Sequence, residues 1–486
     1  MEKSNLARGR RKRAVIIGAG MAGSILASGL LKSHDTIVID LSKKKMQLPI
    51  GLREEGIPAG FAPHVGSGPG GTTAYWHNGL IVPDEGDFTS WPISQIELSN
   101  HFARAFFLLS GTELRKAAEA AALVQAEYIN RGVLPELLCD FLYYARRRRN
   151  LWNALGMDKR PVAYLQGRVR RLVISDDARV TGVLIETEQG QEIIQADLVI
   201  CCAGGLSSPL IIRETARFYQ LDFLEQAGSH YHDHPWCFIA DIKLKARFHD
   251  IWNYSPPGIT GVLRTPMVVR TAAGQKVAFY LRPAAFFHQR QNAFNVISDL
   301  RNSPYNLTHI ARLFRNPSEM LEIASFLFGV NLPTENYVVL LTAEQIPSNY
   351  LAVEEDHGTG AIVRRWYLDD VFKAGLRSAF QFFLKSLGPI IKDVTVYPNW
   401  EEGMKSGAHH SGTCRMATEQ TRGVCDANCK IFGINNAYIC DGSIIPNTGY
   451  SPSGLTIAAL SLRLVDFLTK DGSFGENQRH VQFKAV

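Results

Sequence analysis

Three glycines near the N-terminus have a spacing that suits the binding of a phosphate group. They occur in Gly18-Ala19-Gly20-Met21-Ala22-Gly23, which directly follows the apolar run from Ala14 to Ile17. In such a turn the first glycine allows a tight bend and the second lets a pyrophosphate approach the backbone. The third glycine lets the following helix pack closely on the strand. The pattern therefore predicts a dinucleotide-binding turn.

The residues around this turn predict the elements that hold it. Ala14 to Ile17 is an apolar run typical of a strand buried in a parallel sheet. A helix over about 22–32 would offer its N-terminal N–H groups and its dipole to phosphates. A second strand, Thr36 to Ile39, ends at Asp40, about 20 residues beyond the glycines, where a carboxylate can bind a ribose. These features indicate dinucleotide binding without distinguishing NAD from FAD.

A second glycine-rich stretch runs from Gly66 to Thr73. It contains too many glycines for a helix or a strand, so we expect a loop whose backbone closely approaches another group. The aromatic and polar run from Tyr75 to Gly79 follows it, which is unusual for a solvated linker.

The stretch from Val169 to Cys202 predicts an antiparallel meander followed by a buried strand. Turns at 176–177 and 189–190 separate three β-rich runs. Leu198 to Cys202 then enters Ala203-Gly204-Gly205, and a helix is expected to begin near Ser208-Pro209. A second unit of strand, glycine turn and helix fits a sheet that binds both ends of a long, two-part nucleotide such as FAD.

Composition excludes several classes of protein. The 486 residues are 46% hydrophobic, which allows a large core and two or three structural units. The net charge of +6 is spread without a long single-sign block, so we do not expect nucleic acid as a partner. The sequence contains no stretch of about 18 uninterrupted apolar residues, so we do not expect a membrane span. The basic run from Arg8 to Arg13 precedes a stretch soon broken by glycines, so we interpret it as the start of the fold rather than a secretory signal, and expect a cytoplasmic protein.

The cysteines do not indicate a disulfide scaffold or a metal site. There are eight in the chain, too few for a scaffold of this length, and we expect most to be reduced and buried. Cys414, Cys425 and Cys429 match no common zinc spacing, and no histidine pair completes them. We therefore expect no metal.

Several motifs, in order from about Arg13 to about Leu468, resemble those of the glucose–methanol–choline (GMC) oxidoreductase family. They are the glycine turn, Gly70 to Thr73, Trp91 to Ser94, Ala203 to Pro209, Asp233 to Pro235, Gly407 to Met416, Gly423 to Asp426, Asp441 to Pro446 and Leu455 to Leu460. The resemblance implies FAD and an α/β fold, with a Rossmann-like (doubly wound) FAD-binding domain and an inserted α+β substrate domain on a largely antiparallel sheet. It also implies that the chain oxidises a hydroxyl group.

On this basis the chain divides into two domains and a tail. The FAD-binding domain is expected to comprise 1–90, 160–235 and 395–470. The substrate-binding or cap domain comprises 91–159 and 236–394, and 471–486 form a polar tail.

The residue pattern and the resemblance together assign residues to FAD. These are Gly18, Gly20, Met21, Ala22, Gly23, Asp40, Gly70, Gly71, Thr72, Asn78, Gly79, Val169, Ala203, Gly204, Asp441 and Gly442. Some family members attach the flavin covalently through a histidine shortly after the paired glycines. An ungapped count puts Tyr75 at that position, and a shifted alignment puts His77 there. We expect non-covalent FAD, since the phosphate and ribose contacts suffice for tight binding.

The chemistry requires a base, because the hydroxyl proton must leave as hydride leaves the carbon. Histidine suits this role near neutral pH, and the chain has 14 histidines. His409 lies three residues before Gly412, the spacing at which the family's base occurs. The competing candidate for the base is the adjacent His410. We expect the two residues to lie on a strand, where adjacent side chains point to opposite faces, so only one of them would face the substrate. We expect His234, in Asp233-His234-Pro235, to be structural.

The second member of the catalytic pair is left open by the sequence. The family usually places a His or Asn in the segment corresponding to Gly449 to Gly454, where the ungapped position holds Pro452. Proline has no side-chain donor, so Ser451, Asn447 or another residue is expected to take this role instead.

The leading hypothesis is an FAD-dependent dehydrogenase or oxidase acting on an alcohol, with a sugar, glycoside or aminosugar as the expected substrate. The electron acceptor stays open between oxygen, a quinone and a protein. The alternatives are a flavin or NAD reductase of another class, and a flavin-binding scaffold that has lost catalysis, the latter motivated by Pro452.

Overall fold

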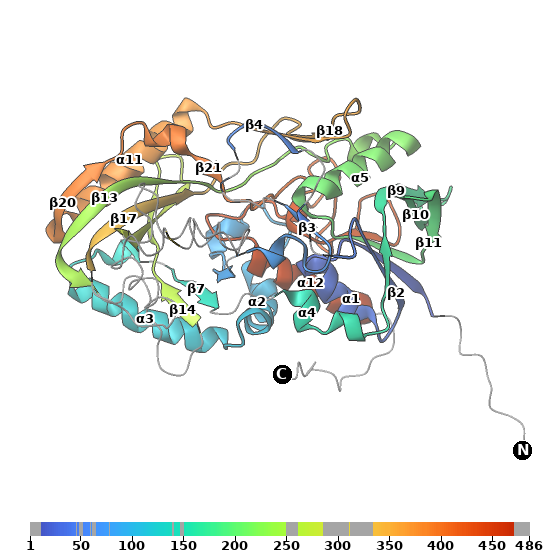
Figure 1. Ribbon diagram of the computed structural model, residues 1–486, viewed down its shortest axis with the longest axis horizontal. Helices are drawn as coiled ribbons and strands as arrows, with labels where there is room; N and C mark the ends of the chain where they lie inside the picture. The colour runs from blue at the N-terminus through green and yellow to red at the C-terminus, as the bar shows by residue number, and fades with distance from the viewer. Residues whose placement is uncertain are drawn as a thin grey trace, which may run out of the picture.

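The structure is a computed structural model that describes residues 11–44, 46–47, 52–58, 60, 65–76, 78–138, 140–145, 150–248, 261–284, 311 and 334–470. Two sheets with their covering helices lie at opposite ends of an elongated molecule (Figure 1). One end carries β2 (Asp35–Asp40) and α1 (Met21–Leu30), and the other carries β13 (Pro235–Phe248) and α11 (Asp370–Leu387).

The first sheet is parallel and contains the nucleotide-binding turn. Its central strand β1 (Arg13–Ile17) pairs with β2 on one side and β12 (Leu198–Cys201) on the other. The five strands have the order β22 (Ala437–Ile439), β12, β1, β2 and β8 (Ala163–Gln166). The predicted order of strand, glycine turn, helix, strand and terminal acid is therefore confirmed.

Three helices and an inserted meander surround this sheet. The helix α12 (Gly454–Lys470) contacts both α1 and α2 (Gln95–Ser110). Gly29 permits the close approach, because a Cβ there would lie 2.6 Å from the side chain of Val465. The predicted meander is present as three antiparallel strands, β9 (Arg168–Ile174), β10 (Val180–Thr187) and β11 (Gly190–Gln195).

The helix after β12 begins earlier than we expected. It is α5 (Gly204–Tyr219), so Pro209 lies inside the helix and not at its start. Proline has no N–H to donate to the carbonyl four residues earlier. That carbonyl, of Gly205, accepts a hydrogen bond from the Thr413 hydroxyl at 2.7 Å, which replaces the lost one. The tertiary contact therefore lets the helix extend across the proline.

The second sheet is antiparallel and contains no glycine turn of this kind. Its strands have the order β15 (Met267–Arg270), β16 (Lys276–Pro283), β17 (Thr334–Ala343), β13 and β20 (Ile391–Val396), and β21 (Lys405–Ser406) pairs with the start of β13. The helix α11 covers one face, where the Phe383 ring stacks on Phe279 with centroids 4.4 Å apart. This sheet is the predicted antiparallel platform, so the predicted fold class is confirmed.

Shorter elements complete the fold around the two main sheets. One small sheet joins β6 (Gly79–Leu80), β7 (Leu142–Ala145) and β14 (Gly261–Arg264). A second joins β4 (Leu52–Gly56), β18 (Val353–Glu355) and β19 (Ile362–Trp366). The pair β3 (Met46–Gln47) and β5 (Gly66–Ser67) and the helices α3 (Leu114–Asn130) and α4 (Leu151–Ala154) complete this set.

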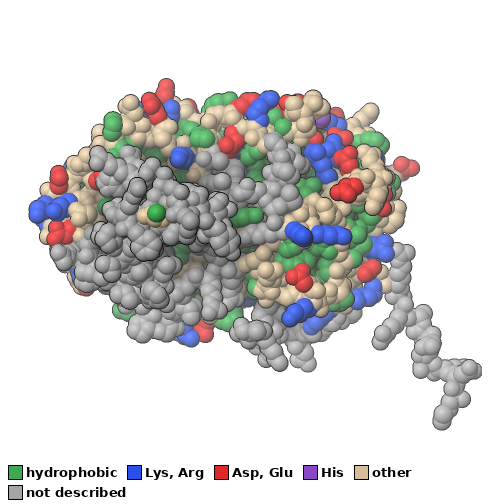
Figure 2. All heavy atoms as spheres, viewed as in Figure 1, with side chains coloured by type: hydrophobic (Ala, Val, Ile, Leu, Met, Phe, Trp, Pro, Cys, Tyr) green, Lys and Arg blue, Asp and Glu red, His purple; other side chains and the backbone are tan. Residues whose placement is uncertain are grey.

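The core and the surface agree with the composition. Side chains of α2 and α4 belong to the same hydrophobic cluster as β1, so part of 91–159 packs with the nucleotide-binding sheet. The seven cysteines that the structure describes are all buried thiols. Basic and acidic side chains are interspersed on the face shown in Figure 2. Within the described ranges, every helix is too short or too polar to cross a membrane.

Candidate functional site

The three glycines of the nucleotide-binding turn have different surroundings. Gly18 has φ +104°, and a Cβ on it would lie 2.4 Å from the carbonyl oxygen of Cys202. A Cβ on Gly23 would lie 1.9 Å from the carbonyl oxygen of Gly18. A Cβ on Gly20 would meet no protein atom within 4 Å. The protein's own packing therefore requires the first and third glycines, whereas the second borders open space at the start of α1.

The second glycine loop lies directly against this turn. The Gly70 N–H donates to the Ala19 carbonyl at 2.9 Å, and a Cβ on Gly71 would lie 2.9 Å from the Gly20 Cα. The expected close backbone approach is therefore present, although the residues Gly71–Ala74 form a short 3₁₀ helix that we did not predict. The i to i+3 hydrogen bond from the Tyr75 N–H to the Thr72 carbonyl explains it.

Asp40 connects the two glycine segments. Its Oδ2 accepts a hydrogen bond from the Ala19 N–H at 2.7 Å, and its Oδ1 accepts one from the Gly68 N–H at 2.7 Å. Burial raises the pKa of this carboxyl, although the backbone hydrogen bonds act in the opposite direction. In the structure Asp40 therefore connects the two glycine segments through their backbone N–H groups. Its contact with a ribose stays a prediction.

Two buried polar atoms lie in and directly after the second glycine loop. Ser67 Oγ and Trp76 Nε1 are buried and form no hydrogen bond with any residue in the described ranges. Buried polar atoms usually have partners, so a ligand with hydrogen-bonding groups would satisfy them. These atoms and the open space at Gly20 are the features of the structure that a bound dinucleotide such as FAD would use.

The predicted FAD-binding segment at Asp441 and Gly442 forms hydrogen bonds with the start of α5. Asp441 Oδ2 accepts from the Gly204 N–H at 2.8 Å and from the Ser208 hydroxyl at 2.6 Å. Gly204 has φ +85°, and a Cβ on it would meet no atom within 4 Å. A Cβ on Gly442 would lie 2.7 Å from the His410 carbonyl oxygen, so this segment adjoins the histidines.

Other residues assigned to FAD make contacts within the protein. The buried Asn78 amide donates to the Leu109 carbonyl at 3.2 Å, and Thr72 Oγ1 accepts from the Gly66 N–H at 3.1 Å. Of the remaining assigned residues, Met21 and Ala22 lie in the first turn of α1, Gly79 lies in β6, Val169 lies in β9 and Ala203 directly precedes α5. Their contacts with FAD stay predictions. Tyr75 is described, whereas His77 lies outside the described residues.

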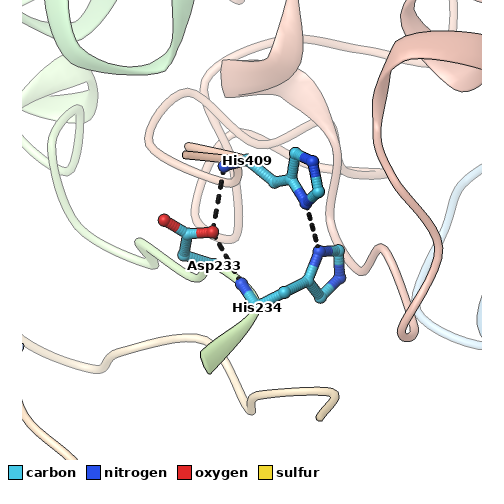
Figure 3. Close-up of side chains that lie close together, drawn as sticks. All are labelled: Asp233, His234 and His409. Carbon is cyan, nitrogen blue, oxygen red and sulfur yellow. Dashed lines mark hydrogen bonds between the residues drawn. The ribbon is translucent and has the colours of Figure 1, made fainter. Parts of the chain in front are cut away.

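A pair of histidines lies at the boundary between the two sheets. Pairing of β13 with β21 aligns Pro235 with Ser406, which brings the residues before one strand next to those after the other. As a result, Nδ1 of His409 lies 2.7 Å from Nδ1 of His234 (Figure 3). His234 Nε2 lies 2.8 Å from the Gly449 carbonyl oxygen and 3.0 Å from Thr448 Oγ1.

Asp233 holds both histidines through their backbones. Its Oδ1 accepts from the N–H of His409 at 2.9 Å and from the N–H of His234 at 2.6 Å (Figure 3). Its Oδ2 accepts from the hydroxyls of Ser406 and Tyr231. Burial alone would raise the pKa of Asp233, but the nearby histidines and the Ser406 hydrogen bond lower it below its usual range. Asp233 is therefore a fully buried carboxylate with several hydrogen-bond donors around it.

Both imidazoles of the pair are neutral near pH 7. Burial and, as a smaller cause, the charge of a protonated His409 together lower the pKa of His234 to about 3. Burial also lowers the pKa of His409, and only the Asp233 carboxylate raises it. His234 is 1% exposed, whereas His409 is partly accessible, so His409 is the member of the pair that a ligand can reach.

Our expectation that His409 and His410 lie on a strand was wrong. The strand β21 ends at Ser406, and Ala408 has φ +59°, which turns the chain in a conformation that side-chain-bearing residues rarely adopt. The two side chains do not separate to opposite faces of a sheet. His410 Nδ1 lies 2.9 Å from the Tyr231 hydroxyl and 3.6 Å from Asp233 Oδ2. Both histidines therefore converge on the segment 231–234.

The two candidates for the second catalytic residue differ in their surroundings. The Asn447 amide donates to Glu344 at 2.9 Å and its oxygen accepts from the Gly449 N–H at 2.9 Å, so it holds the loop that contacts His234. Ser451 Oγ is buried and makes no hydrogen bond with the part of the chain that the structure describes. Of the two candidates, Ser451 is thus the one whose side-chain oxygen has no partner among the described residues.

The sequence did not indicate that His234 contacts His409. We expected a structural residue, and the structure makes it the hydrogen-bond partner of the candidate base. The two residues are 175 positions apart, so no spacing rule connects them. The only local signal was the histidine in the Asp233-His234-Pro235 motif.

The cluster of Asp233, His234 and His409 has the composition of a metal site, with one potential ligand atom from each residue within 4.8 Å of the others. The distances argue against that use. Two nitrogen ligands of a tetrahedral zinc ion lie about 3.3 Å apart, given Zn–N bonds of about 2.0–2.1 Å. The two Nδ1 atoms are only 2.7 Å apart, which is the distance of a hydrogen bond. The arrangement is therefore that of a hydrogen-bonded pair.

Comparison with known proteins addresses the fold. Residues 296–461 match the family model described as GMC oxidoreductase. The structure is similar to that of pyridoxine 4-oxidase from Mesorbium loti, with a TM-score of 0.56 and 14% identity, covering 94% of this chain and 99% of that one. The resemblance to the GMC oxidoreductases is therefore confirmed. An FAD-dependent oxidoreductase from Chaetomium thermophilum is also similar, with a TM-score of 0.57, 12% identity and coverage of 95% and 99%.

Curated relatives among the GMC oxidoreductases are distant in sequence. A 2-methyl-1,2-propanediol dehydrogenase of Mycolicibacterium austroafricanum is 23% identical over 341 residues, which is 67% of this chain and 57% of that protein. A pyridoxine 4-oxidase of Microbacterium luteolum is 25% identical over 154 residues, which is 28% of each protein. The chain thus spans little more than half the length of the first of these relatives and about a quarter of the second.

Proposed function

We propose that this chain binds FAD non-covalently and oxidises a hydroxyl group of a small alcohol to a carbonyl, with His409 as the base. When bound, FAD would supply the acceptor for the hydride that leaves the substrate carbon. The proposal is supported by the glycine turn, whose Gly20 borders open space, and by the confirmed family resemblance. The single observation that carries it is the neutral, partly accessible imidazole of His409.

The role of His409 follows from its surroundings. Removal of a hydride from a carbon would leave a protonated carbonyl unless the hydroxyl proton leaves at about the same stage, so a base must lie nearby. A neutral imidazole can accept that proton, and His409 is held in place at its backbone N–H by Asp233. Ser451 is proposed to bind the same hydroxyl group, because its buried Oγ makes no hydrogen bond with the described residues.

The proposed substrate is a sugar, a glycoside or an aminosugar. Its support is the similarity of the segment His409-His410-Ser411-Gly412-Thr413 to that of sugar-oxidising family members. The two curated relatives are named for a diol and for pyridoxine, so a small molecule with more than one hydroxyl group fits both sources of evidence.

Two measurements on the purified chain test this proposal. Bound FAD is expected to give absorption bands near roughly 370 and 450 nm. Anaerobic mixing with a panel of sugars, glycosides and simple alcohols is then expected to bleach the 450 nm band with at least one of them. Absence of both bands after reconstitution with FAD would refute the cofactor assignment. Bands that no alcohol bleaches would instead favour a flavin-binding scaffold.

A further inference from the structure

The hydrogen bonds around the histidine pair determine where its protons are. A neutral imidazole has one N–H donor and one lone pair, whereas a backbone carbonyl can only accept. His234 Nε2 lies 2.8 Å from the Gly449 carbonyl oxygen, so this nitrogen must carry the hydrogen. Thr448 Oγ1, at 3.0 Å from the same nitrogen, can share that hydrogen as a second acceptor. It follows that His234 Nδ1 is the nitrogen with the lone pair.

The proton on His409 is fixed by the same logic. Its Nδ1 lies 2.7 Å from His234 Nδ1, a distance that requires one hydrogen between the two nitrogens. Because His234 Nδ1 has only a lone pair, the hydrogen belongs to His409 Nδ1. His409 Nε2 is then left without a hydrogen.

The opposite arrangement has an electrostatic penalty. If His409 carried its hydrogen on Nε2, either two lone pairs would face each other between the Nδ1 atoms or His234 would move its hydrogen to Nδ1. In the second case the Gly449 carbonyl would face a lone pair on a nitrogen that is fully buried. A buried acceptor without a donor costs about 1–3 kcal/mol.

We propose that His234, anchored by the Gly449 carbonyl, is a positioning residue that fixes His409 in the tautomer with a lone pair on Nε2. This inference rests on the proposed function for the identity of the proton that Nε2 accepts. In that reaction the substrate O–H bond breaks and an N–H bond forms at Nε2. The electron pair of the O–H bond becomes the second bond of the carbonyl, and bound FAD would supply the acceptor for the hydride that leaves the carbon.

The charge that forms on His409 also has a place in this arrangement. After accepting a proton, His409 donates through Nδ1 to His234 and carries a positive charge near the Asp233 carboxylate. That carboxylate favours the protonated form of His409, because its negative charge raises the pKa of the imidazole. Asp233 therefore stabilises the state that follows proton transfer without touching the substrate.

The tautomers can be measured directly. In the full chain labelled with ¹⁵N-histidine, two-bond ¹H–¹⁵N correlation spectra at pH 7 distinguish a protonated from an unprotonated ring nitrogen. We expect the Nδ1–H tautomer for His409 and the Nε2–H tautomer for His234, with signals assigned through His409→Gln and His234→Gln. An Nε2–H tautomer for His409 would overturn the inference.

Three variants separate positioning from a general structural effect. His234→Leu removes the acceptor, so His409 is expected to lose its single tautomer and anaerobic flavin reduction to slow about tenfold or more. His234→Asn places an amide oxygen near the position of Nδ1, so it is expected to restore the tautomer and most of the rate. Thr448→Val removes the shared acceptor but leaves the Gly449 carbonyl, and is expected to leave the tautomer unchanged.

The outcomes also separate this inference from the proposed function. A chain that oxidises no alcohol but shows the two tautomers would refute the function and retain the positioning role. The second case is a wild-type chain whose flavin band is bleached by an alcohol, together with a His234→Leu variant in which His409 keeps the Nδ1–H tautomer. This result would support the proposed function and refute the positioning role. If His234→Leu does not fold, the wild-type tautomers and the His234→Asn variant still decide.

Discussion

The nucleotide-binding turn and the histidine site are built in opposite ways. The turn consists of consecutive residues from Gly18 to Gly23, in which the protein's own packing requires Gly18 and Gly23 and leaves open space at Gly20. The histidine site joins residues from 231–234, 406–410 and 448–449, which are far apart in the sequence and are brought together by the fold. The comparison teaches that a backbone requirement is visible locally, whereas a side-chain partner depends on the folded structure.

The largest effect is expected for Gly20→Val. The protein itself leaves room for a side chain there, since φ is −69° and no atom lies within 4 Å of a Cβ. The variant should therefore fold but retain no FAD, because the side chain occupies the space of the phosphate oxygens. Circular dichroism and the flavin-to-protein ratio measure the two effects.

Two further glycine variants sharpen this prediction. Gly388→Val is the matched control, since Gly388 also borders open space at a φ of −46°, and it should retain FAD. Gly23→Val should fail to fold, because its Cβ would overlap the Gly18 carbonyl oxygen. A full flavin content in Gly20→Val would show that the turn does not hold phosphate.

The next largest effect is expected for His409→Ala. This variant should keep FAD, since the glycine turn is unchanged, but reduce flavin with a rate lower by a factor on the order of 10² or more, the range for removal of a general base. His410→Ala should lose less, because its Nδ1 contacts Tyr231 rather than His234. Anaerobic stopped-flow measurements compare them, and a normal rate in His409→Ala with a slow one in His410→Ala would assign the base to His410.

A smaller effect is expected for Asp40→Ala. The change removes the acceptor for the Ala19 and Gly68 N–H groups and for the predicted ribose contact, so FAD should bind more weakly in a chain that still folds. Titration of the apoprotein with FAD gives the dissociation constant. Asp40→Asn keeps one acceptor oxygen and should lie between the two, and equal affinity in all three proteins would contradict the assignment.

The smallest effect concerns stability and pH. Burial lowers the pKa of His232 to about 4, whereas an unfolded histidine titrates near about 6.5. As pH falls from 6.5 to 4, the unfolded chain therefore binds a proton that the folded chain does not, so the free energy of unfolding decreases. The slope for one such histidine is about 1.4 kcal/mol per pH unit.

Variants of two buried groups with opposite effects on stability test the direction of this pH dependence. His232→Gln should flatten the decrease measured by urea unfolding between pH 6.5 and 4. Burial raises the pKa of Asp140 to about 6, so its folded form binds a proton first and stability increases as pH falls through 6. Asp140→Asn should therefore steepen the decrease. Changes in the reverse directions would refute the assigned burial effects.

Much of the first region could be predicted from sequence. The glycine spacing, the apolar strand and the acid at Asp40 form a recurring pattern within one stretch of about 30 residues, so they could be recognised together. The meander was predicted for the same reason, since its turns and strands are local. The start of α5 was not, because the Thr413 hydroxyl compensates for Pro209 from a distant part of the chain.

The sequence by itself determined that a dinucleotide turn exists and that His409 and His410 are the histidines to consider. Only the tertiary structure decided which imidazole faces His234 and which faces Tyr231. The pairing of Pro235 with Ser406 brings these segments together, and the positive φ of Ala408 sets their direction. A tautomer depends on hydrogen-bond partners within about 3 Å, and residues so far apart in the chain reach that distance only through the fold.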